Sequence, residues 1–175
     1  MSDRIGPAVS VIALLVVLLG LMALGWRARR RRQRTLPEPP RPPAGLATPT
    51  LEVDVLYVAT TTAGQPLDRL TVRPLGFRGR AGARVHDAGL VLAIDGEREV
   101  LVPADRITGS GLATYAIDRV VEEGGLVAVT WILDEAAGTT VDTYLRVIDP
   151  REKTALVDAL HRIPRLAHDD DNEGK

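Results

Sequence analysis

The sequence predicts an N-terminal transmembrane helix followed by a mainly β domain, a small barrel or sandwich of about seven antiparallel strands with a C-terminal helix. Three observations carry this prediction. Residues 5–26 form an unbroken apolar run, residues 51–147 alternate apolar and polar positions between short turn-forming stretches, and residues 152–163 repeat apolar side chains at helical spacing.

The apolar run is long enough to cross a membrane. It has 22 residues and no ionisable side chain, and a helix of that length spans roughly 33 Å, against about 30 Å for a hydrocarbon core. A cleaved secretory signal is the alternative, but its apolar core is usually shorter, and Trp26 stands where a small-residue cleavage site would be needed. We therefore expect a short extracytoplasmic N-terminus at residues 1–4 and a single transmembrane helix at residues 5–26.

A basic juxtamembrane segment, residues 27–34, follows the apolar run. Its arginines are Arg27, Arg29, Arg30, Arg31, Arg32 and Arg34. Flanking arginines resist translocation, so we expect this segment and everything after it on the cytoplasmic side of the plasma membrane. We also expect these side chains to contact anionic lipid headgroups.

Charge is divided sharply along the chain. Residues 1–50 carry eight arginines against two acids, a balance of +6, which leaves 14 Lys+Arg against 21 Asp+Glu, a balance of −7, for residues 51–175. An acidic domain lacks the basic footprint that general nucleic-acid binding requires. We therefore expect no nucleic-acid partner.

Residues 35–50, TLPEPPRPPAGLATPT, contain six prolines. Proline fixes φ and carries no amide hydrogen, so we expect a Pro-rich linker that does not pack and acts as a semi-rigid spacer of up to about 50 Å. An alternative is that an aromatic-lined groove of a partner docks Pro39, Pro40, Pro42 and Pro43.

Alternation predicts strands at residues 51–57 and 141–147, each with one buried face. Residues 126–133 are apolar on both faces apart from Thr130 and predict a central strand, with Trp131 in the core. Tyr144 lies on the polar face of its strand, where either a solvated position or part of an exposed contact surface is expected.

Turn signals arrive at short intervals between these strands. The Asp95-Gly96 pair predicts the clearest hairpin, because it readily takes the positive φ values of a tight turn. Residues 109–111, Gly-Ser-Gly, predict another turn. Such regular punctuation favours an antiparallel sheet.

A helix of three to four turns is predicted to close the domain at its C-terminal end. Residues 149–152, DPRE, have the form of an N-cap, an N1 proline and a capping-box acid, and Leu156, Leu160 and Ile163 then recur on one face. Residues 164–175 form an acidic tail that we expect to be disordered.

Four segments carry a resemblance to a known family: LYVATTTAGQPLDR at 56–69, GFRGRA at 76–81, TYAIDRVVE at 114–122 and DTYLRV at 142–147. The chain resembles the actinobacterial single-span membrane proteins that have a cytoplasmic bacterial PH-like domain. The resemblance implies a PH-like domain at residues 51–163, no established activity, and genes often placed among those of pyrimidine biosynthesis.

The sequence offers little catalytic chemistry. His86, His161 and His168 are widely separated, and none has a cysteine or an acid at metal-ligand spacing. Ser110 lies between two glycines but has no paired base. We therefore expect no enzyme activity, no cofactor and no metal site.

The best local constellation is basic and consists of Arg73, Arg78, Arg80 and Arg84. On a strand from Arg78 to His86, alternation places these last three arginines and the histidine on one face. Three interpretations are open. The arginines pair with acids at positions 95, 97 or 99, or grip anionic lipid or phosphate, or contact an acidic protein partner.

These observations favour a membrane-anchored, non-catalytic interaction or scaffold module with an unknown cytoplasmic protein partner. Sensing of an anionic lipid or a phosphate ligand through the arginine face is the alternative. An accessory subunit of an export or transport complex is the third interpretation, since one span cannot build a transport pathway alone.

Overall fold

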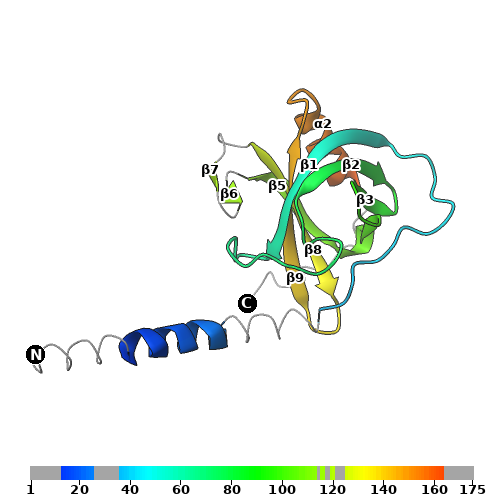
Figure 1. The fold of residues 1–175 in the computed structure, drawn as a ribbon. Helices are drawn as coiled ribbons and strands as arrows, with labels where there is room; N and C mark the ends of the chain where they lie inside the picture. The colour runs from blue at the N-terminus through cyan, green and yellow to red at the C-terminus, as the bar shows by residue number, and fades with distance from the viewer. Residues whose placement is uncertain (1–12, 26–35, 114, 117–118, 121–124, 164–175) are drawn as a thin grey trace, which may run out of the picture. The chain divides into compact units, whose positions relative to one another are not determined.

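The computed structural model describes residues 13–25, 36–113, 115–116, 119–120 and 125–163 (Figure 1). The chain divides into two units, Met1–Leu36 and Pro37–Lys175. The predicted N-terminus at 1–4, the basic segment at 27–34 and the acidic tail at 164–175 lie outside the described residues.

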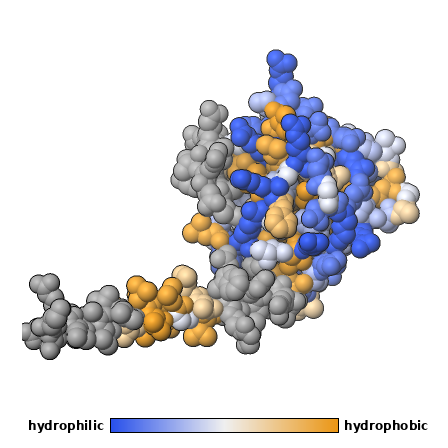
Figure 2. Space-filling model, viewed as in Figure 1, coloured by the Kyte–Doolittle hydropathy of each residue, from blue (hydrophilic) through white to orange (hydrophobic). Residues whose placement is uncertain are grey.

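In the first unit, residues 13–25 form a helix whose side chains are exposed. Figure 2 shows this helix as predominantly hydrophobic. No helix within the described ranges is both long and apolar enough to cross a membrane. Residues 5–12 and Trp26 of the predicted span lie outside those ranges.

The second unit contains a seven-stranded antiparallel sheet and a C-terminal helix. The strands follow the order β4-β3-β2-β1-β9-β8-β5. Their bounds are β1 (Leu51–Thr62), β2 (Gly79–His86), β3 (Gly89–Ile94), β4 (Val100–Pro103), β5 (Ile107–Ala113), β8 (Leu126–Asp134) and β9 (Thr139–Val147). A separate pair consists of β6 (Tyr115–Ala116) and β7 (Arg119–Val120), and the 3-10 helix η2 (Ala104–Arg106) joins β4 to β5. The predicted mainly β architecture is confirmed.

The sheet curves around one core (Figure 1), and helix α2 (Glu152–Arg162) contacts β1, β2 and β5. Alternation in β1 buries Val53, Val55 and Tyr57, as predicted. Trp131 of β8 is fully buried, so its predicted core position is confirmed.

The Asp95-Gly96 turn joins β3 to β4 as predicted, with Gly96 at a φ of 79°. The turn predicted at residues 109–111 is wrong, because these residues lie within β5 and pair with β8. Gly109 lies opposite Thr130, where the register shifts, and a Cβ at Gly109 would be 3.6 Å from the Thr130 Cβ. That distance is an ordinary van der Waals contact, so Gly109 is an ordinary strand residue and not a turn glycine.

Helix α2 buries Leu156, Ala159 and Leu160, and Ile163 just beyond it is also buried. The predicted apolar face is therefore confirmed. The predicted N-cap at Asp149 and first helical position at Pro150 are two residues early, because the helix begins at Glu152 with Arg151 as its N-cap. The Asp149 carboxylate accepts the backbone N–H of Arg151 at 3.0 Å in the turn before the helix.

Residues 38–50, which we call the strap, lie against the sheet instead of standing free. Leu101 N donates to Pro40 O at 2.9 Å, and Thr50 N donates to Val85 O at 2.8 Å. Pro39 is buried. This packing differs from the unpacked spacer predicted for residues 35–50. Proline disfavours helix and cannot donate to a sheet ladder, yet its ring can be buried and its carbonyl can accept, so a Pro-rich segment suits the flank of an edge strand.

Candidate functional site

The four arginines predicted as a contact site fall into two groups. Arg73 and Arg78 are exposed in the loop between β1 and β2, and Arg80 is exposed at the second position of β2. Arg84 is half-buried and forms an ion pair with Glu99. The charge-pairing interpretation therefore holds for Arg84, while Arg73, Arg78 and Arg80 have no ion pair with any described residue.

The predicted strand from Arg78 to His86 begins one residue late. β2 starts at Gly79, so Arg78 belongs to the loop. Alternation beyond it is confirmed, since the odd positions from Ala81 to Val85 are buried. His86 does not join the exposed face, because it is 6 % exposed and its Nδ1 lies 2.9 Å from Ala47 O in the strap.

The sheet register adds an arginine that the sequence did not assign to the site. On the outer face, Leu56 of β1 pairs with Arg80 of β2 on one side and Arg146 of β9 on the other. Neighbouring strands lie about 4.8 Å apart, so the two arginines flank Leu56 across roughly 10 Å. Arg146 is exposed. We call Arg78, Arg80 and Arg146 the arginine surface. Arg73 is exposed in the same loop as Arg78.

Alternation had already placed Arg146 on an outward face, but only the pairing of β9 with β1 brings it near Arg80. Farther along the same face β1 carries two acids. In the strand register Glu52 lies opposite Arg84, and Asp54 lies opposite Gly82. Basic charge is thus concentrated at one end of the outer face.

Apolar side chains accompany the arginine surface. Phe77, next to Arg78 in the loop, is 67 % exposed, and Leu56 between the two arginines is 37 % exposed. Guanidinium groups beside exposed apolar groups suit contact with a surface that is both anionic and apolar.

A buried chain of hydrogen bonds ties the β1–β2 loop to the core. Its four distances are 3.0 Å from Trp131 Nε1 to Thr143 Oγ1, 2.9 Å from Thr143 Oγ1 to Thr60 Oγ1, 2.9 Å from Thr60 Oγ1 to Tyr57 Oη, and 2.8 Å from Tyr57 Oη to Leu75 O. The indole N–H can only donate and the Leu75 carbonyl can only accept, so Trp131 and Tyr57 are the donors at the two ends of this chain.

This chain ends in the loop segment that carries Arg73 and Arg78. Leu75 is fully buried, so its side chain and its carbonyl are both fixed. Burial raises the pKa of Tyr57 to about 12, which keeps its hydroxyl a donor to the Leu75 carbonyl. The loop is therefore anchored at its centre.

Tyr144 does not form part of an exposed contact surface. It is 7 % exposed, and burial, with the negative charge of Asp142 adding to it, raises its pKa. Tyr144 and Leu126 form a second apolar cluster, joined by Val58, Ala113 and Ala128. The alternative of an exposed Tyr144 is wrong, because the facing residues on β1, β5 and β8 are apolar.

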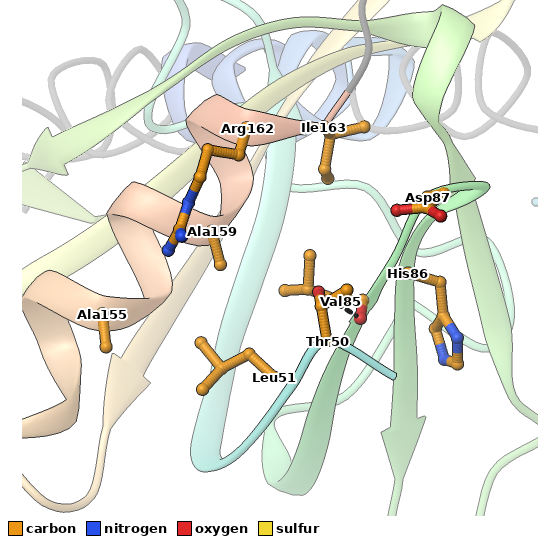
Figure 3. Close-up of a pocket in the computed structure, with 9 residues that line it drawn as sticks. All are labelled: Thr50, Leu51, Val85, His86, Asp87, Ala155, Ala159, Arg162 and Ile163. Carbon is orange, nitrogen blue, oxygen red and sulfur yellow. Dashed lines mark hydrogen bonds between the residues drawn. The ribbon is translucent and has the colours of Figure 1, made fainter. Parts of the chain in front are cut away.

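A cavity of about 190 Å³ lies between α2 and the ends of β1 and β2 (Figure 3). Its ionisable side chains do not converge. Figure 3 shows Arg162 lying along α2, where its Nε donates to Asp158 O at 3.1 Å, and shows the His86 ring on the side of β2 away from α2. Without converging polar groups this cavity lacks the form of a catalytic or small-ligand site.

Within the described ranges, the remaining histidine, aspartate and glutamate side chains form no metal-binding group. No cluster of three metal-ligating side chains is found where the structure describes the chain. His161 Nε2 lies 3.0 Å from Ser110 O, so its ring is bound to the backbone of β5. His168 lies outside the described residues.

The fold and the match to known families agree. The bacterial PH domain-like family matches residues 36–161, which is most of the chain. The chain belongs to this family. A comparison with curated proteins found no match.

The match to the bacterial PH domain-like family begins at residue 36, so it includes the strap as well as the sheet. PH-like domains are generally non-catalytic, and the fold of this chain is consistent with an interaction module.

Proposed function

We propose that this protein is a single-pass plasma-membrane protein whose PH-like domain acts as a non-catalytic scaffold and holds a protein partner at the cytoplasmic face. The partner contacts the arginine surface. The observation that carries this proposal is the exposed end of the outer sheet face, where Arg80 and Arg146 flank Leu56 and form no ion pair with any described residue.

Membrane attachment rests on the apolar residues 5–26 and the six arginines that follow them. A reporter that is active only in the cytoplasm, fused after Lys175, is expected to be active. Activity only from a reporter that requires an extracytoplasmic location would overturn the proposed orientation.

The partner is sought by proximity labelling in cells, with a labelling enzyme fused to the full chain. We expect one reproducible soluble protein that is labelled by the wild type and lost on Arg78→Glu plus Arg80→Glu. Arg151→Glu, an exposed arginine just before α2, is the matched control and is expected to retain the labelling. Labelling no different from that of an unrelated anchored protein would count against the proposal.

A link to pyrimidine biosynthesis is a finer proposal, supported only by the gene context of the family that the chain resembles. The same labelling experiment tests it. Enrichment of pyrimidine enzymes over the anchored control supports the link, and their absence among reproducible partners removes it.

Contact with anionic phospholipid is a second candidate function, favoured by Phe77 at 67 % exposure beside Arg78. Flotation of residues 36–175 with phosphatidylglycerol vesicles tests it. We expect binding that weakens with salt and is lost on Arg78→Ala plus Arg80→Ala. Absence of binding at low salt, with the fragment folded by circular dichroism, would remove this candidate.

A further inference from the structure

The outer edge of β4 is one end of the seven-stranded sheet, and the strap covers it. β4 pairs only with β3 among the strands. An uncovered edge strand presents unpaired amide and carbonyl groups that can pair with another chain. The way in which the strap occupies this edge therefore indicates what else could bind there.

Three contacts hold the strap at β4, and they run in order along both segments. Glu38 Oε2 accepts from Arg98 Nη2 at 3.0 Å, Pro39 O accepts from the same Nη2 at 3.1 Å, and Pro40 O accepts from Leu101 N at 2.9 Å. Two of these contacts use the Arg98 side chain just before β4, and the third is a backbone hydrogen bond to β4 itself.

These contacts are individually weak. The Glu38 side chain is 67 % exposed and that of Arg98 is 22 % exposed, and ion pairs of this kind contribute between 0 and about 1 kcal/mol. Between residues 38 and 46 only Pro39 is buried. The covalent connection of the strap to β1 gives it a high effective concentration at this edge.

The strap also leaves hydrogen-bonding capacity unused. Pro39 and Pro40 have no amide hydrogen, so neither can donate to a carbonyl of β4. An extended segment with an ordinary residue at the position of Pro40 could both accept from Leu101 N and donate to this edge. Such a segment would bind the edge more strongly than the strap does.

We propose that the outer edge of β4 together with Arg98 is a binding site for an extended segment with an acidic residue, supplied by a partner protein. The strap occupies this site in cis through Glu38, Pro39 and Pro40 and competes with the partner segment. The site is separate from the arginine surface, so the proposal does not depend on the function proposed above.

The test uses the full chain and a fluorescent peptide, TLPEPPRPP, which copies residues 35–43. Binding is measured by fluorescence anisotropy. Glu38→Arg repels the strap from Arg98 but leaves the site intact, so we expect the peptide to bind about two- to fivefold more tightly than to the wild type. Arg98→Glu alone is expected to show no such gain, because it removes the arginine that the glutamate of the peptide would contact. Glu38→Arg plus Arg98→Glu is also expected to show none, because it restores the strap contact with exchanged charges.

A matched control is available in a second exposed ion pair. Arg106 Nη2 and Glu135 Oε2 are also 3.0 Å apart, with side chains 24 % and 59 % exposed. Glu135→Arg is expected to leave peptide binding at the wild-type level. Equal binding to the wild type and Glu38→Arg would overturn the proposal, and so would binding that survives Arg98→Glu in a chain with an unchanged melting temperature.

Discussion

Residues whose polar groups are buried fix the loop that bears Arg73 and Arg78. The hydrogen-bond chain from Trp131 to Leu75 O joins β8, β9 and β1 to the β1–β2 loop. No sequence pattern reveals this chain, because its threonines are separated by 83 positions and meet only when β1 pairs with β9.

Thr143→Val tests the chain at its centre. Valine keeps the shape of threonine but removes the hydroxyl, which leaves the buried Trp131 N–H without an acceptor. We expect a loss of about 1–3 kcal/mol in the free energy of unfolding, measured by denaturant titration of the full chain. Thr154→Val on the exposed side of α2 is the control, with an expected change below about 0.5 kcal/mol.

Tyr57 makes stability sensitive to alkaline pH. Its pKa is about 12 in the folded chain, against 10.0 for an ordinary tyrosine. Because the folded chain holds the Tyr57 proton more tightly than the unfolded chain does, this proton stabilises the folded state. The contribution to the free energy of unfolding is complete below pH 10 and is lost as the pH rises through 12. We expect about 3 kcal/mol to be lost across that window, and Tyr57→Phe to remove this part of the dependence. An equal decline in both proteins would contradict the assignment.

At the scale of elements, the local sequence patterns predicted which faces of the strands and the helix are buried. Which segments lie side by side became visible only in the strand pairing of the structure. Alternation identified the buried faces of β1 and β2, and helical spacing identified the face of α2. The strap and Arg146 were missed for one reason. Both depend on which segments lie side by side, and composition or periodicity within one segment does not contain that information.

Gly89 at the start of β3 and Gly96 in the β3–β4 turn provide a test of strand packing. A Cβ at Gly96 would meet nothing within 4 Å, so Gly96→Ala introduces only the strain of its positive φ, about 1–2 kcal/mol. A Cβ at Gly89 would lie 2.1 Å from Val102 O, because β3 and β4 approach closely there. We expect Gly89→Ala to lower the melting temperature more than Gly96→Ala does. Equal shifts would contradict the described approach of the two strands.

At the scale of the whole molecule, the chain consists of a basic part and an acidic part, which anionic surfaces attract and repel respectively. Residues 1–50 have a balance of +6 from eight arginines and two acids, and the other 125 residues have a balance of −7 from 14 basic and 21 acidic side chains. An anionic surface repels the second part overall, so any anionic partner must engage it locally. Figure 2 shows a largely hydrophilic face with separate hydrophobic patches on this part.

Site-specific photo-crosslinking from position 56 tests the proposed contact surface most directly, because Leu56 lies between Arg80 and Arg146. A photoreactive residue there, in the full chain in living cells, is expected to give one discrete protein adduct that disappears with Arg80→Glu plus Arg146→Glu. The same residue at position 151 is expected to give none. No protein adduct from position 56, or the same adducts from both positions, would contradict the account.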